Sequence, residues 1–385
     1  MEKQEKNTYP IKKNEVKVEN KMDEYRMQKL DKEKNRIAVS DAIRIDDKIW
    51  FMSDTFNGLF CMEIASQQIE FIGSFPNEPY SQRFLYSAME RVGTKIYFAP
   101  YFAKNIAVYD MKNCMFEEIE IAEELRQSEL PKDLFYGMQR YNNFLFFIPA
   151  YGKAIIRLNS DNNEVQYMTE WMEKADVNFD RSYKGFGPQR LLRENKLFVP
   201  FHSMNSVLEI DCDTFNCVIH RLNVDAMGFS GICDDGEKIW LYSMREGDLI
   251  GWNPNSNEIV RVKIFEEGIQ TSWDKNCRMI YYNNKIMIFW VFENHRKMRE
   301  NVNFVMENKA GYMFAREEED YIIFCERNTS LLTIIDKKNK TEHKIEMSSN
   351  NKIMDMWKVI REKGVFTEIQ EFTIKNYLDE LLRVK

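Results

Sequence analysis

The stretch Lys95-Ile-Tyr-Phe-Ala-Pro100, followed after a short gap by Asn105-Ile-Ala-Val-Tyr-Asp110, decides the fold. Each half is rich in β-branched and aromatic residues, which favours a strand, and polar residues on either side mark turns. The same phrase recurs along the chain, and such internal repetition outranks any local motif. The seven copies are 36 to 52 residues apart and begin at Lys48, Lys95, Phe144, Lys196, Lys238, Lys285 and Tyr321.

Turn residues divide each repeat into four strands. A two-residue turn such as Gly93-Thr94 or Asn142-Asn143 precedes the aromatic strand, and a second polar turn such as Ser160-Asp-Asn-Asn163 follows the next apolar strand. A blade of four antiparallel strands buries both faces only against neighbouring blades, so the repeats should close into a ring. The sequence predicts an all-β protein, a β-propeller of about seven four-stranded blades. A ring of six blades remains an alternative, because the repeat at Lys285 lacks a clear second half.

The repeat predicts a propeller over residues 36–348 with an extension at each end. Residues 1–35 are about half charged and lack periodicity, which is typical of a flexible arm. In the C-terminal extension, residues 349–385, apolar residues from Thr367 onward fall near helical spacing, which predicts an amphipathic helix. This helix either packs on the propeller or docks a partner.

Composition narrows the classes of partner. The net charge is −7 and the isoelectric point is about 5.5, so no overall positive field exists to attract nucleic acid or anionic lipid. No run of 18 apolar residues is present, and the first residues are charged, so we expect no membrane span and a cytoplasmic protein. Seven cysteines, an odd number scattered over the repeats, indicate reduced thiols.

The phrase Lys48-Ile-Trp-Phe51, a short gap, an Asn and a strand that ends in Asp is similar to the blades of the streptogramin lyase type and, more loosely, of kelch proteins. The resemblance covers about residues 37 to 347. For the lyases it implies a metal-assisted elimination that opens a cyclic ester, with clustered His and Glu side chains. The four histidines, His202, His220, His295 and His343, are scattered along the chain, and only His295 has a glutamate two residues before it, Glu293.

The inter-blade connections indicate where a ligand would bind. If the first strand of a blade is innermost, the loops between strands two and three and the connections between blades emerge on one face, which we call the long-loop face. Three long connections, 74–83, 122–134 and 170–187, lie in the first half of the chain. Long irregular segments on a rigid scaffold are where sites usually lie. We therefore expect the site beside blades two to four.

Proline ends the aromatic strand in the same three blades, at Pro100, Pro149 and Pro200. Because proline lacks the ladder donor, it turns the residues that follow toward the channel rim. Aromatic platforms with Arg and Gln suit a sugar, a nucleotide-like ring or a peptide side chain, whereas a purely structural role would only shape the blade edge. The predicted ligand-binding residues are Arg83, Tyr101, Gln139, Arg140, Tyr151, Tyr183, Gln189, Arg190, Phe201 and His202.

These patterns favour a noncatalytic recognition or scaffolding propeller that binds a small polar, carbohydrate-like ligand or a protein partner. The alternative is a lyase or glycan-acting enzyme with its site at the channel mouth, for which His202 is the candidate acid or base. We expect no cofactor and no metal, because no cluster of metal ligands is evident in the sequence. The pattern leaves the oligomeric state open.

Overall fold

The computed structural model describes residues 38–347, with gaps at 55–56, 80–81, 124–133, 178–184, 245–246, 267–275, 293–295, 301, 307–309, 328 and 330. The predicted arm over 1–35 and the predicted helix after Thr367 lie outside the described residues. Residues 37–347 form one compact unit. Within the described residues, no helix has the length and apolarity needed to cross a bilayer.

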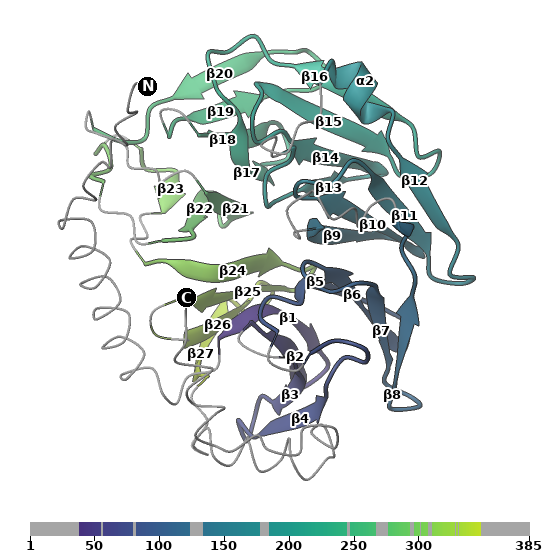
Figure 1. Ribbon diagram of the computed structural model, residues 1–385. Coiled ribbons are helices and arrows are strands. Elements are labelled where there is room, and N and C mark those ends of the chain that lie inside the picture. The colour runs from purple at the N-terminus through teal and green to yellow at the C-terminus, as the bar shows by residue number, and fades with distance from the viewer. Residues whose placement is uncertain are drawn as a thin grey trace, which may run out of the picture. The chain divides into compact units, whose positions relative to one another are not determined.

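Seven sheets form the ring that the repeat predicts, and their strands pair antiparallel except for one short strand of the sixth sheet. Within each sheet the strands follow one another in chain order, from the channel outward. Figure 1 shows the first strands of the blades around the centre. The first three blades are β1 (Val39–Ile45), β2 (Lys48–Ser53), β3 (Leu59–Glu63) and β4 (Ile69–Gly73); β5 (Tyr86–Val92), β6 (Lys95–Pro100), β7 (Ile106–Asp110) and β8 (Met115–Ile119); and β9 (Phe135–Tyr141), β10 (Phe144–Pro149), β11 (Ile155–Asn159) and β12 (Val165–Met168).

The remaining blades complete the ring, and one short helix, α2 (Trp171–Ala175), lies in the connection from the third to the fourth blade. The last four blades are β13 (Leu191–Arg193), β14 (Lys196–Pro200), β15 (Ser206–Asp211) and β16 (Cys217–Arg221); β17 (Phe229–Asp234), β18 (Ile239–Ser243), β19 (Leu249–Trp252) and β20 (Ile259–Val262); β21 (Cys277–Tyr282), β22 (Lys285–Trp290) and β23 (Val305–Met306); and β24 (Tyr312–Glu317), β25 (Tyr321–Glu326), β26 (Leu331–Asp336) and β27 (Thr341–Glu346).

The hairpin turns explain why strands begin and end where the sequence predicts. The first turn of most blades carries a residue with positive φ, including Asp46 at 56°, Gly93 at 59° and Asn142 at 53°. These residue types tolerate the left-handed region that two-residue hairpins require. Each second strand therefore starts within one residue of the predicted repeat start.

The sixth blade departs from the common pattern. Its third strand, β23, has two residues and pairs with β22 in parallel, and the described part of the blade has three strands. After Trp290 the sequence is polar, so no apolar strand can fold back as in the other blades. Residues near Met298 instead bridge to Phe265, and the Arg299 N–H donates to the Ile264 carbonyl at 3.0 Å.

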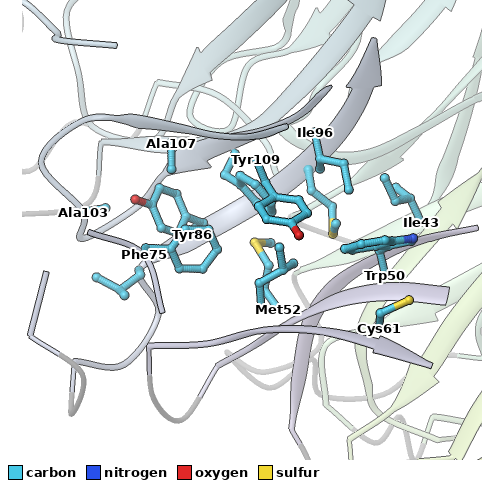
Figure 2. Packing of buried hydrophobic residues seen from close by; sticks show 14 of the residues in the cluster. Ile43, Trp50, Met52, Cys61, Phe75, Tyr86, Ile96, Ala103, Ala107 and Tyr109 are labelled. Atoms are coloured by element: carbon cyan, nitrogen blue, oxygen red, sulfur yellow. The ribbon is translucent and has the colours of Figure 1, made fainter. Parts of the chain in front are cut away.

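Blades pack on each other through aromatic and aliphatic side chains. Between the first two blades, Trp50 and Met52 meet Tyr109 and Tyr86, and Phe75 of the connection joins them (Figure 2). The Trp50 and Tyr109 ring centroids lie 5.7 Å apart. Complete burial of one such side chain contributes roughly 1.5–3 kcal/mol. Wedges of this kind lie at each successive junction from the first blade to the seventh.

Within residues 38–347 as described, each blade is one continuous segment of chain, and the last and first blades share no strand. The ring is therefore closed between the last and first blades by side-chain contacts. Arg316 of β24 forms ion pairs with Asp41 of the first blade at 3.2 Å and with Glu90 of the second at 2.7 Å. Its guanidinium also donates to the Met89 carbonyl at 2.6 Å, and the Met89 N–H donates to Asp41 at 2.9 Å. One arginine therefore joins three blades.

Similar contacts cross the other junctions. The Gln189 side chain donates to the Met279 carbonyl at 2.5 Å and accepts the N–H groups of Met279 at 2.7 Å and Ile232 at 3.0 Å. Arg190 donates to the Met138 carbonyl, and Gly137 beside it leaves room, because a Cβ there would collide with the guanidinium. Unpaired backbone groups on the inner edges of first strands thus gain partners.

Candidate functional site

One backbone hydrogen bond recurs in all seven blades on the long-loop face. A residue just past each second strand donates its N–H to a carbonyl upstream of the first strand of the same blade, with N···O distances of 2.8 to 3.1 Å. The donors lie six residues after the start of each repeat phrase, so they occupy equivalent places around the ring. We call them the rim positions: Asp54, Tyr101, Ala150, His202, Met244, Val291 and Arg327.

The charged rim positions are Asp54 of the first blade and Arg327 of the last, which meet where the ring closes. Asp54 is only 2% exposed, and its Oδ1 has no hydrogen-bond partner among the described residues. Burial raises the pKa of Asp54, while the positive charges of Arg83 and Arg327 act in the opposite direction. A buried acceptor without a partner is costly and is uncommon in folded proteins.

Two arginines lie close enough to Asp54 to influence its charge. Arg83, from the connection between the first and second blades, lies over the Phe84 ring at 5.0 Å, and its buried Nε has no partner in the described structure. Arg327 donates from Nε to the Val291 carbonyl at 2.8 Å. The surroundings of Asp54 therefore combine an unsatisfied acceptor, Asp54 Oδ1, with an unsatisfied donor, Arg83 Nε.

Aromatic side chains continue the rim beside this junction. Tyr101 stacks on Tyr136 of β9, with ring centroids 5.9 Å apart and an interplanar angle of 16°, and both residues are half-buried. Tyr101 also contacts Phe102, with centroids 4.8 Å apart. Tyr151 is half-buried and follows the rim position Ala150. Tyr101 thus lies at the rim, and Tyr136 adds a second ring that the sequence reasoning did not name.

His202 occupies the rim position of the fourth blade. Its Nε2 lies 3.3 Å from Oδ1 of Asn276, which precedes the first strand of the sixth blade. The contact spans the fifth blade, where Gly228 packs against the His202 carbonyl. Phe201, the preceding residue, is fully buried among Trp171 and other aromatics, so it belongs to the core.

The other predicted residues lie lower along the channel or at its far end. Gln189 and Arg190 make the inter-blade contacts described above. The Gln139 side chain donates to the Arg140 carbonyl at 3.3 Å, and Arg140 is exposed near the first hairpin of its blade, where it donates to the Arg91 carbonyl at 2.9 Å. Tyr183 lies outside the described residues. The rim thus brings together only some of the predicted set.

Asp54, Arg327 and Tyr136 were missed, although the sequence held a signal for the first two. Counting six residues from each repeat start reaches Asp54 and Arg327 as it reaches Tyr101 and His202. The proline that drew attention to blades two to four is absent from blades one and seven. Among the described residues, no group of three His, Cys, Asp or Glu side chains is placed as metal ligands would be.

Comparison with known proteins supports the fold. No family model matches the chain, and no curated protein matches it by sequence. Among solved structures, a catalytically inactive virginiamycin B lyase from Staphylococcus aureus with quinupristin is similar at 15% identity, covering 77% of this chain and 93% of that chain, with a TM-score of 0.52. A streptogramin B lyase (14% identity, 82% and 84% covered) and U3-55K (9%, 80% and 81%) each give 0.46. The chain is a propeller whose fold is similar to that of the virginiamycin B lyase structure.

Replacing Asp54 with asparagine should raise the melting temperature at pH 8. Because burial raises the pKa of Asp54 in the folded protein, its ionisation costs folding free energy that is absent at low pH and grows as pH rises above the unfolded value. The gain should therefore shrink toward pH 4. Thermal unfolding followed by circular dichroism across this range measures it. The exposed turn variant Asp46→Asn is the control, and a gain for Asp54→Asn that does not change with pH would contradict the assignment.

Proposed function

We propose that this propeller is a noncatalytic recognition domain that binds a small polar, carbohydrate-like ligand at the rim of its long-loop face. The observation that carries the proposal is the pair of unsatisfied atoms, Asp54 Oδ1 and Arg83 Nε, beside the stacked Tyr101 and Tyr136. Native proteins rarely leave buried polar atoms unpaired, and such atoms call for a missing partner. A bound ligand would supply it.

The chemistry of this group of residues suits a polyhydroxylated molecule. A carboxylate oxygen accepts a hydrogen bond from a sugar hydroxyl, and a guanidinium N–H donates to a hydroxyl oxygen. A tyrosine face packs against the apolar face of a sugar ring, as aromatic side chains do in small-molecule sites. Asp54, Arg83 and Tyr101 together provide these three kinds of contact.

The lyase or glycan-acting alternative requires two titratable groups that meet at the reacting atoms. His202 is the candidate acid or base, and its Nε2 lies 3.3 Å from the amide oxygen of Asn276, a group that does not titrate. Asp54 is influenced by two arginines, and no histidine contributes to its pKa. These contacts favour binding over acid–base catalysis at the rim.

The test is thermal unfolding of the purified protein against neutral mono- and oligosaccharides, amino sugars and uronic acids. A ligand that binds only the folded state at about 100 times its Kd stabilises by roughly 2.7 kcal/mol, so the melting temperature must rise. Tyr136→Ala should abolish the rise. Lys95→Ala, which removes an exposed ion pair on the second blade, should retain it. The absence of a shift with any sugar, or a shift that Tyr136→Ala leaves intact, would rule out the proposed site.

A further inference from the structure

Arg278 and Arg327, from the last two blades, act on each other electrostatically, and both contact the stretch 311–313 at the start of the last blade. Arg278, on β21, donates from Nη1 to the Met313 carbonyl at 3.2 Å. Arg327, at the rim, donates from Nε to the Val291 carbonyl, and its guanidinium lies over the Phe292 ring at 4.9 Å. Each side chain is thereby anchored by one backbone carbonyl. A guanidinium carries five N–H donors, so most donors of both have no partner among the residues that the structure describes.

The nearby acidic groups do not balance these two charges. Asp41 is engaged by Arg316 at 3.2 Å and by the Met89 N–H. Asp54 faces Arg83 as well as Arg327, and it forms no ion pair within the described part of the chain. The same part of the chain provides no ion pair for Arg278 or Arg327. Asp54 thus faces both Arg83 and Arg327, and Asp41, the acidic group that acts on Arg278, is already paired with Arg316.

The electrostatics of the pair agree with this imbalance. Burial lowers the pKa of Arg278, and the charge of Arg327 lowers it further, while Asp41 and Tyr136 act the other way. Burial likewise lowers the pKa of Arg327, opposed by Asp54. Two half-buried cations that repel each other gain from an anion placed between them.

We infer that the ligand of this site carries an anionic group, a carboxylate, sulfate or phosphate, which is held by the guanidinium groups of Arg278 and Arg327. The inference rests on the proposed function, since it specifies the ligand of the same rim. In this arrangement the Tyr101–Tyr136 pair contacts the ring of the ligand, and Asp54 and Arg83 bind its hydroxyls. The ligand class is therefore an acidic sugar such as a uronic acid or a sugar phosphate.

Isothermal titration calorimetry at pH 7.5 with glucuronate, glucose 6-phosphate and glucose tests the inference. Glucuronate or glucose 6-phosphate should bind more tightly than glucose. Arg327→Gln and Arg278→Gln should each weaken the binding of the acidic sugar by about tenfold or more, the usual cost of a lost charge-assisted hydrogen bond. The affinity for glucose should not change. Arg91→Gln, which changes an exposed arginine near the first hairpin of the second blade, is the control. Titrations with inorganic sulfate and inorganic phosphate alone show whether the anionic group is enough for binding without the sugar ring.

The outcomes separate the two proposals. If glucose binds as tightly as glucuronate and the arginine variants bind all sugars normally, the anion inference is wrong and the proposed recognition function stands. If no sugar binds, both are wrong. Circular dichroism checks the fold of each variant. If Arg278→Gln does not fold, Arg327→Gln decides the result alone, because its guanidinium makes a single backbone contact at the rim.

Discussion

Replacing Arg316 with alanine should destabilise the propeller by about 3–5 kcal/mol, the cost of removing one partner from a buried ion pair. The side chains of Arg316, Asp41 and Glu90 are only 9–12% exposed, and Arg316 also holds the Met89 carbonyl. Its loss leaves two buried carboxylates without their cation where the last blade meets the first. In the described part of the chain, no shared strand compensates at this junction.

The effect should depend on pH. Burial raises the pKa of Glu90 to about 7, and Arg316 opposes that rise. Without Arg316 the pKa of Glu90 rises further, so the penalty for ionising Glu90 grows as pH increases from the unfolded value. The destabilisation should accordingly be larger at pH 8 than at pH 5.

Urea unfolding of the wild type, Arg316→Ala and the double variant Arg316→Ala/Glu90→Gln measures this effect. The double variant should recover part of the loss, because it removes one of the stranded carboxylates. Lys95→Ala, which breaks an exposed pair with Glu117, should cost less than about 1 kcal/mol. A loss for Arg316→Ala no larger than that of Lys95→Ala would mean that this arginine does not hold the ring closed.

A large loss of folding stability is also expected for Gly228→Ala. A Cβ at residue 228 would overlap the backbone carbonyl of His202 and lie 2.9 Å from the Ser203 amide nitrogen. Backbone atoms cannot move aside as a flexible side chain can, and overpacking typically costs about 1–3 kcal/mol, with more expected where backbone must shift. Because the clash displaces His202, the variant should also alter the rim.

Chemical unfolding and the sugar titrations together test this variant. Gly152→Ala is the matched control, because the Cβ it adds would come no closer than 3.1 Å to any neighbour. It should lose much less stability than Gly228→Ala. Equal losses for the two glycine variants would show that the close approach at Gly228 does not constrain the fold.

The architecture could be predicted because local patterns encode it. Strand periodicity and turn residues such as Gly93 and Asn142 act over a few neighbours, and they recur often enough to count blades. The sixth blade was recognised as irregular because its apolar second half is missing after Trp290. Its parallel pairing with β23 was not foreseen, since that pairing depends on how a polar segment returns to the sheet.

The site was harder to predict because its contacts join distant parts of the chain. Asp54 and Arg327 come from opposite ends of the repeat array, and no local pattern shows that they meet. Gln189 and Arg190 were proposed as ligand-binding residues from their place on an inner strand. Both residues come just before the first strand of the fourth blade, and the structure uses their polar groups to satisfy backbone edges of other blades. Local sequence does not show which polar side chains the fold itself requires.

The continuous blades also impose an order of events during synthesis. Arg316 lies 227 residues after Met89, so the carbonyl of Met89 and the carboxylates of Asp41 and Glu90 emerge from the ribosome long before their partner. At about 5–20 residues per second the nascent chain waits roughly 11–45 s for this arginine. The early blades spend that interval as an open arc with an exposed aromatic flank, which chaperones of the cell would have to shield until translation of the last blade ends.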